Sequence, residues 1–172
     1  MLSGVEVVSG SAGADSITID TNDIEVVSGG AGVDAVTLTD ASGNAVELDG
    51  VESVTGSAGA DSITINTNDI EVVSGGAGVD AVTLTDASGN TVNLDGVEDV
   101  TGSDGSDSIT INTNDIEVVS GGAGFDAVTL TDASGNTVEL DGVESVTGSA
   151  GADTLTVTDD TSSTLDLSLI HI

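Results

Sequence analysis

The sequence contains no lysine and no arginine, whereas 31 of its 172 residues are aspartate or glutamate, giving a formal net charge of −31. A chain without basic side chains cannot neutralise phosphate, so we expect neither nucleic acid nor an anionic membrane surface as a partner. Cysteine is absent, which excludes disulfides and thiolate metal sites. Proline, tryptophan and tyrosine are also absent, and Phe125 is the only aromatic residue. This composition favours a narrow aliphatic solenoid over a conventional globular core.

High net charge accompanies disorder only when hydrophobicity is low, and here 37% of the residues are hydrophobic. They are mostly Val, Ile, Leu and Ala in short alternating runs. The composition therefore predicts a folded protein whose charge is compensated from outside, most simply by cations. No apolar run approaches the roughly 20 residues that span a bilayer, so we expect no membrane insertion.

The sequence repeats itself every 46 residues. Units this small cannot each bury a core, so they are expected to stack on one another. We divide the chain into a single repeat array over residues 1–166, with units 4–49, 50–95 and 96–141 and a partial unit 142–166. The second and third units differ only at Ser53/Asp99, Ala58/Asp104, Ala60/Ser106, Val79/Phe125 and Asn93/Glu139.

Both ends of the chain predict a truncated array. Leu2, Gly4 and Val5 align with Leu48, Gly50 and Val51, so the repeat is already in register at the N-terminus. Residues 167–172 leave the repeat pattern and translate CTG TCT CTT ATA CAC ATC, which resembles a transposase adapter used in sequencing libraries. We interpret these six residues, with His171 among them, as translated adapter; the alternative is an ordinary apolar final strand.

Hydrophobic alternation predicts an all-β fold with essentially no helix. Ile17 and Ile19 alternate with Thr18, the period-2 pattern of a half-buried strand. We predict a parallel β-solenoid, similar to a β-roll, of alternating 19- and 27-residue coils. The third strand of each long coil, for example 91–94, is either a hairpin excursion or a third side. The short coils are Val5–Asp23, Val51–Asp69 and Val97–Asp115, and the long coils are Ile24–Gly50, Ile70–Gly96 and Ile116–Gly142.

A glycine-rich turn, Gly-[Gly/Ser]-x-Gly-x-Asp, occurs seven times. Glycines permit turns that expose backbone carbonyls, and carbonyls with carboxylates form the oxygen-only ligand set that suits calcium. We expect the turns to stack in a single column along one edge. The candidate metal-binding aspartates are Asp15, Asp34, Asp61, Asp80, Asp107, Asp126 and Asp153. The candidate carbonyl donors are Gly10, Gly13, Gly29, Gly32, Gly56, Gly59, Gly75, Gly78, Gly102, Gly105, Gly121, Gly124, Gly148 and Gly151.

Electrostatics adds to this expectation. Neighbouring coils lie about 4.8 Å apart, and two carboxylates at that distance repel by roughly 3–4 kcal/mol at an effective dielectric near 20. A divalent cation between successive turns would replace this repulsion by a bridge, so that metal binding contributes to folding.

The turns 29–34 and 75–80, each followed by Ala-Val-Thr-Leu, resemble the haemolysin-type calcium-binding repeat of repeats-in-toxin (RTX) proteins. The resemblance covers roughly residues 5–157. It implies a right-handed β-roll that holds several calcium ions between successive turns, in a protein secreted by a bacterium and located outside the cell or on its surface. The chain departs from the family in its 19/27 spacing and in the serine that four turns carry at the second position, Ser11, Ser57, Ser103 and Ser149.

These observations predict a calcium-stiffened spacer or scaffold in a secreted adhesin or surface protein. Its partners are calcium ions and neighbouring repeats, and any glycan or cell-surface ligand is expected elsewhere in the parent protein. The alternative is an ice- or polysaccharide-binding solenoid that uses outward threonines such as Thr83 and Thr85, and a β-propeller is the rival fold. We expect no enzyme, because no Ser-His-Asp arrangement can be assembled. A second acidic ladder, interpreted as a solvated face, comprises Glu6, Glu25, Glu52, Glu71, Glu98, Glu117 and Glu144.

Overall fold

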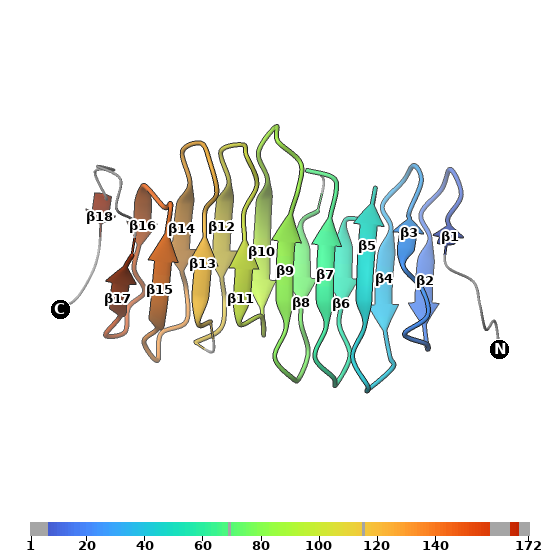
Figure 1. Cartoon of the computed structure of the whole chain (residues 1–172), viewed down its shortest axis with the longest axis horizontal. Helices are drawn as coiled ribbons and strands as arrows, with labels where there is room; N and C mark the ends of the chain where they lie inside the picture. The colour runs from blue at the N-terminus through green and yellow to red at the C-terminus, as the bar shows by residue number, and fades with distance from the viewer. Residues whose placement is uncertain (1–6, 69, 115, 159–165, 169–172) are drawn as a thin grey trace.

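The computed structural model describes residues 7–68, 70–114, 116–158 and 166–168. Within these ranges the chain forms eighteen strands and no helix, arranged as two nine-stranded sheets. Every pairing between the strands is parallel, and the chain crosses from one sheet to the other at each turn, which makes a β-solenoid of about eight turns (Figure 1). The predicted all-β parallel solenoid is confirmed. Since no helix occurs in this part of the chain, none of it belongs to a helix that could cross a membrane.

The odd-numbered strands form the first sheet and the even-numbered strands form the second. The first sheet contains β1 (Val7–Ser9), β3 (Val26–Ser28), β5 (Ala45–Asp49), β7 (Ser62–Ile65), β9 (Ala81–Leu84), β11 (Asp99–Thr101), β13 (Val118–Ser120), β15 (Thr137–Asp141) and β17 (Thr154–Val157). The second contains β2 (Ser16–Ile19), β4 (Ala35–Leu38), β6 (Ser53–Thr55), β8 (Val72–Ser74), β10 (Thr91–Asp95), β12 (Ser108–Ile111), β14 (Ala127–Leu130), β16 (Ser145–Thr147) and β18 (Asp166–Ser168).

The strand register defines the length of a coil. Val26 pairs with Glu47, 21 residues further on, whereas Ala45 pairs with Ser62, 17 residues further on. Coils of nearly equal length therefore run through the whole stack. Five strands fit into each 46-residue repeat, so that β3, β8 and β13 carry the same Val-Val-Ser sequence but alternate between the sheets. One repeat is thus two and a half coils, and the structure returns to the same face only after two repeats.

The predicted alternation of 19- and 27-residue coils is therefore wrong. The predicted long coil Ile70–Gly96 contains three strands, β8, β9 and β10, and β10 pairs with β8 and β12 in the second sheet. Its third strand is neither a hairpin excursion nor a third side, because it is half of the next coil. The same holds in the first sheet for β5, which pairs with β3, and for β15, which pairs with β13. The error arose because the connecting turns differ in length while the strands they join are equivalent.

Aliphatic side chains fill the space between the two sheets. In β9, Val82 and Leu84 point inward and are 1% exposed, while Ala81 and Thr83 face outward. Each such fully buried side chain contributes about 1.5–3 kcal/mol, so the aliphatic stack is the main source of stability. None of the five positions that vary between the second and third units lies in this core.

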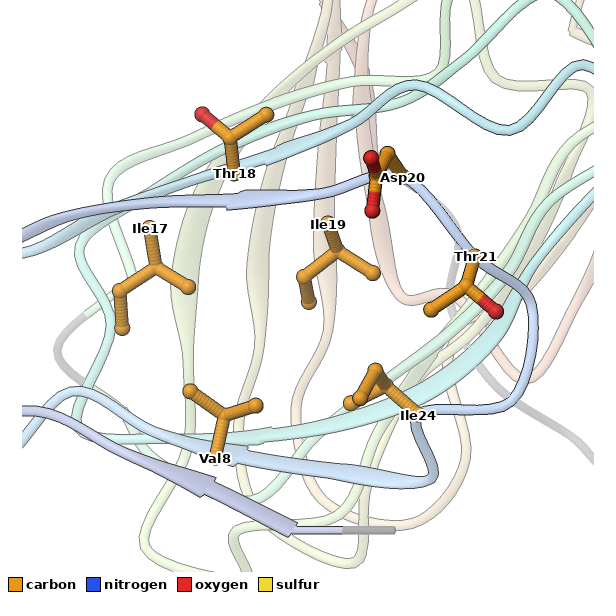
Figure 2. A pocket seen from close by; sticks show the side chains of 7 residues that line it. All are labelled: Val8, Ile17, Thr18, Ile19, Asp20, Thr21 and Ile24. Atoms are coloured by element: carbon orange, nitrogen blue, oxygen red, sulfur yellow. The ribbon is translucent and has the colours of Figure 1, made fainter. Parts of the chain in front are cut away.

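A cavity of about 280 Å³ opens at the first described coil. Val8, Ile17, Ile19 and Ile24 point into the gap between the strands, as Figure 2 shows. These are the same inward positions that are fully packed in later coils, so the cavity belongs to the core of the stack. At the other end, residues 166–168 pair with β16. Residues 169–172 lie outside the described residues, and the adapter origin of 167–172 stays a prediction.

The two-and-a-half-coil register is testable with engineered cysteines, since the chain has none of its own. Glu47 and Thr64 are direct partners on adjacent strands of the first sheet, so a variant with Glu47→Cys and Thr64→Cys should form an intramolecular disulfide on mild oxidation. The control pairs Glu47→Cys with Thr55→Cys, which lies on the opposite sheet, and should stay reduced. Cross-linking of the control pair but not the first pair, read by mass spectrometry, would contradict the register.

Candidate functional site

The seven glycine–aspartate turns lie on both edges of the solenoid. We call the side where the chain passes from the first sheet to the second the first edge, and the return side the second edge. The turns ending at Asp15, Asp34, Asp107 and Asp126 lie on the first edge, and those ending at Asp61, Asp80 and Asp153 on the second. The predicted single column is therefore wrong, because an odd number of strands per repeat moves each copy to the opposite edge. Glycine–aspartate turns are stacked only in pairs.

Hydrogen bonds between coils tie these turns to their neighbours along each edge. On the second edge the backbone N–H of Asn44 donates to Asp61 Oδ1 (2.7 Å), that of Asp61 to Asp80 Oδ1 (2.7 Å), and that of Asp80 to Glu98 Oε2 (2.7 Å). The same chain of contacts runs on the first edge through Asn90, Asp107, Asp126 and Glu144. We call this the Asn–Asp–Asp–Glu relay. Each carboxylate in this relay accepts a hydrogen bond from a backbone N–H of the preceding coil.

The predicted glutamate ladder separates into two groups. Glu52, Glu98 and Glu144 are partly buried and accept the N–H of the aspartate one coil before them. Glu25, Glu71 and Glu117 are exposed, in agreement with a solvated face. Glu6 lies outside the described residues. The glutamates of the first group are hydrogen-bonded to the turn aspartates. At these positions the glutamate ladder and the aspartate ladder therefore form one hydrogen-bonded chain.

In the Gly-Ser turns, the aspartate carboxylate is saturated with hydrogen bonds. Asp61 Oδ2 accepts from the backbone N–H (2.6 Å) and hydroxyl (3.0 Å) of Ser57, and Asp61 Oδ1 accepts from the backbone N–H and side-chain amide of Asn44, both at 2.7 Å. Asp107 has the same partners in Ser103 and Asn90, and Asp153 has them in Ser149 and Asn136. A charged carboxylate can be buried in this way because its lone pairs are used.

In the Gly-Gly turns, one carboxylate oxygen has no partner. Asp80 is 1% exposed, and its Oδ1 accepts the N–H of Asp61, but its buried Oδ2 has no hydrogen-bond donor in the described structure. Asp34 and Asp126 repeat this arrangement. Leaving a buried polar group unsatisfied costs about 1–3 kcal/mol, and more when it is charged. Among the described residues, three further buried oxygens lack a partner, the amide Oδ1 atoms of Asn44, Asn90 and Asn136. Only the aspartate oxygens belong to a group that carries charge, so they are the places where the fold calls for a positive charge or a proton.

Backbone conformation explains why the two turn classes differ. Gly76 has a φ of +104°, and a Cβ at this position would lie 2.1 Å from the carbonyl oxygen of Ser57. The equivalent Gly30 and Gly122 also have positive φ, whereas the glycines of the Gly-Ser turns do not. Serine is therefore excluded from the second position of the Gly-Gly turns. The hydroxyl that satisfies Asp61 cannot be supplied to Asp80.

The first glycine of each turn allows the coils to approach closely. A Cβ on Gly75 would lie 1.9 Å from the carbonyl oxygen of Gly96 and 2.7 Å from Asp80 Oδ2. The Gly96 carbonyl oxygen and Asp80 Oδ2 therefore both pack against the Gly75 Cα, where only glycine leaves room for them. Gly29 and Gly121 have the same surroundings, with Gly50 and Gly142 as the carbonyl donors. A Cβ on Gly10, Gly56 or Gly102 would lie close to Oδ2 of Asp15, Asp61 or Asp107, respectively.

Only part of the predicted calcium-binding set fits a cation. The described residues contain no group of three or more His, Cys, Asp or Glu side chains arranged to hold a metal ion. The carboxylates of Asp61, Asp107 and Asp153 are occupied by Ser and Asn donors, and Asp15 Oδ2 accepts the Ser11 N–H. The candidate donors that remain are Oδ2 of Asp34, Asp80 and Asp126. The carbonyls near them belong to Gly50, Gly96 and Gly142, which are not among the predicted carbonyl donors. The first glycines of the turns allow the coils to stack closely.

The pKa values of Asp126, Asp80 and Asp153 reflect the balance between burial and the hydrogen bonds that each carboxylate accepts. Burial raises the pKa of Asp126 to about 6; the N–H of Asp107 opposes this rise, and the negative charges of Asp107 and Glu144 add to it. Burial likewise raises the pKa of Asp80. For Asp153, burial acts upward as well, but the hydrogen bonds from Asn136 and Ser149 outweigh it and hold the pKa below its usual range.

Sequence reasoning missed the asparagines of the relay. Asn44, Asn90 and Asn136 are almost fully buried, and each donates to an aspartate of the next coil. Each ends a copy of the segment Asp-Ala-Ser-Gly-Asn, for example 86–90. This segment forms a turn, in which Asp86 Oδ1 accepts the Ser88 N–H at 2.8 Å. The signal that could have revealed Asn90 is its position directly before a strand.

Comparisons of the chain with protein-family models, with curated proteins and with solved structures find no match. The resemblance to the RTX repeat therefore rests on the turn sequences.

The raised pKa values predict how stability depends on pH. Between about pH 4 and pH 6 the folded chain holds a proton on Asp126 that the unfolded chain, with a carboxyl pKa near 3.8, has released. The raised pKa of Asp80 acts in the same direction. The free energy of unfolding should therefore fall as pH rises through this window. Thermal melts in chelator should give a higher Tm at pH 4.5 than at pH 7.5.

The control for this experiment is Asp126→Asn, which removes the titrating group. The difference in Tm between pH 4.5 and pH 7.5 should be smaller in this variant than in the wild type. Asp40, Asp86 and Asp132 have pKa values lowered by hydrogen bonds from Ser42, Ser88 and Ser134, so their contribution is lost only below pH 3.8. A Tm that rises steadily from pH 4.5 to pH 7.5 would contradict the assignment.

Proposed function

We propose that this chain is a calcium-binding structural segment of a secreted bacterial surface or adhesin-type protein, in which it serves as a stiff spacer or scaffold. The observation that carries the proposal is the buried Oδ2 of Asp34, Asp80 and Asp126, which has no donor although the residue is at most 1% exposed. A cation beside each oxygen removes an unpaired buried charge. The continuous stack of parallel coils supports a load-bearing role.

Calcium is the cation whose chemistry suits these groups. The neighbouring donors are a carboxylate oxygen and a glycine carbonyl, with no nitrogen or sulfur ligand, and calcium takes six to eight hard oxygen ligands. When bound, the ion supplies positive charge next to Asp80 and its stacked neighbours Asp61 and Glu98. Water would complete the coordination. At a calcium concentration 100 times the Kd, each site contributes about 2.7 kcal/mol to stability.

The resemblance to RTX repeats supports placing the parent protein outside the cell. Extracellular calcium is abundant, and a chain with a net charge of −31 gains most from a cation-rich medium. Folding and stiffness would then be linked to secretion, since binding free energy becomes folding free energy.

A second candidate function follows from the strand register. Thr64, Thr83 and Thr101 are direct partners in the first sheet, and two further runs of three, Thr18–Thr37–Thr55 and Thr110–Thr129–Thr147, lie in the second sheet. Three-coil threonine ladders favour the alternative of ice or polysaccharide binding, tested by thermal hysteresis and by glycan arrays with Thr83→Lys as the negative control.

The calcium proposal is tested by circular dichroism during heating, in calcium and in chelator. We expect Tm to rise with calcium and to fall when a chelator is added. Sodium chloride at matched ionic strength is the control, because screening of surface charge weakens repulsion without occupying a site. An equal Tm in calcium, chelator and matched sodium chloride would overturn the proposal.

A further inference from the structure

The seven turns that share one sequence motif fall into two chemical classes. In the described Gly-Ser turns beyond the first coil, serine and asparagine donors occupy both oxygens of the aspartate, whereas in the Gly-Gly turns Oδ2 has none. In these copies the second position of the motif, serine or glycine, marks the two classes.

We propose that in the Gly-Ser turns the serine and asparagine donors take the place of a cation, so that cations bind only at the Gly-Gly turns of Asp34, Asp80 and Asp126. This inference rests on the proposed function, because it specifies which turns bind calcium. It assigns one cation to each 46-residue repeat. It also assigns successive cations to opposite edges, since Asp34 and Asp126 lie on the first edge and Asp80 on the second.

Competition for lone pairs is the physical basis. A carboxylate offers about four acceptor positions. Asp61 receives the N–H and amide of Asn44 and the N–H and hydroxyl of Ser57, so a cation can reach it only by displacing donors that are themselves buried. Asp80 receives one N–H, on Oδ1. A cation at Asp80 Oδ2 displaces no hydrogen bond of the described structure.

The order of turns along an edge produces this difference. The coil before Asp61 ends in Asn44, whose side-chain amide donates forward to Asp61. The coil before Asp80 ends in Asp61, which has no side-chain donor to offer. Of the two aspartates in the Asn–Asp–Asp–Glu relay, the second therefore lacks both an asparagine before it and a serine within its own turn.

The distance between the proposed sites keeps the electrostatic repulsion between bound cations small. Consecutive sites are two and a half coils apart, or about 12 Å along the axis at about 4.8 Å per coil. That separation exceeds the Debye length of about 8 Å at physiological ionic strength. Bound cations would therefore repel one another little, and each would neutralise its own carboxylate group.

The test measures bound calcium by equilibrium dialysis on the whole chain and on two variants that carry the same substitution one coil apart. Wild type is expected to bind three ions. Asp80→Asn should lose one of the three, whereas the matched control Asp61→Asn should keep all three. Asp126→Asn provides a second copy of the first variant, should Asp80→Asn not fold.

A second readout needs no calcium. In chelator Asp80→Asn should melt at a higher temperature than wild type, because the unpaired buried charge is gone. Asp61→Asn should melt at a lower temperature, because Ser57 and Asn44 lose their acceptor.

The outcomes separate the inference from the proposed function. Absence of bound calcium in wild type would overturn both. Binding of about seven ions, or the loss of an ion in Asp61→Asn, would overturn the inference and leave the calcium-stiffened spacer standing. Equal destabilisation of Asp80→Asn and Asp61→Asn in chelator would also count against it.

Discussion

The spacing between parallel strands is the constraint on which the rest of this structure depends. At about 4.8 Å per coil, the side chains that begin and end each turn are stacked on their equivalents in the next coil, and so are their charges. Two adjacent carboxylates repel by roughly 3–4 kcal/mol at an effective dielectric near 20. Hydrogen bonds to a charged group return about 1.5–3 kcal/mol each. Saturated carboxylates such as Asp61 are therefore tolerated in the stack, whereas Asp80, with one hydrogen bond, needs further compensation.

The odd number of strands per repeat limits how far acidic residues can accumulate. Had the repeat been a whole number of coils, all seven glycine–aspartate turns would have stacked on one edge. With five strands per 46 residues they alternate, and each edge carries the sequence Asn, Asp, Asp, Glu before a different turn follows. No more than three relay carboxylates are then adjacent. The aspartates with an unpartnered oxygen are thereby divided between the two edges, with Asp34 and Asp126 on the first and Asp80 on the second.

Much of the fold could be predicted from the sequence, because alternation in segments such as 16–19 and 81–84 identifies strands independently of how they pair. Coil length could not be predicted, because the turns that join equivalent strands differ in length. Three residues, Gly96-Val97-Glu98, connect β10 to β11, whereas the longer turn 85–90 connects β9 to β10. Glu52 and Glu71 share the same local motif, yet one accepts a buried N–H and the other is exposed. Their roles depend on the preceding turn and on the coil stacked against them.

The candidate site was predicted in composition but not in arrangement. The aspartates and glycines lie in stacked turns, but in pairs on two edges rather than in one column. The serine at the second position was noted only as a departure from the family motif. In the structure it marks a different kind of turn, in which the Ser57 hydroxyl donates a hydrogen bond to Asp61. That distinction requires the φ of Gly76 and the partner of Asp61 in the adjacent coil, and neither is a property of the motif itself.

The most direct measurement is anomalous scattering from crystals of the whole chain grown with calcium. We predict three ions per chain, beside Asp34, Asp80 and Asp126, on alternating edges and about 12 Å apart along the solenoid axis. A column of ions along one edge, or an ion beside Asp61 or Asp107, would contradict it.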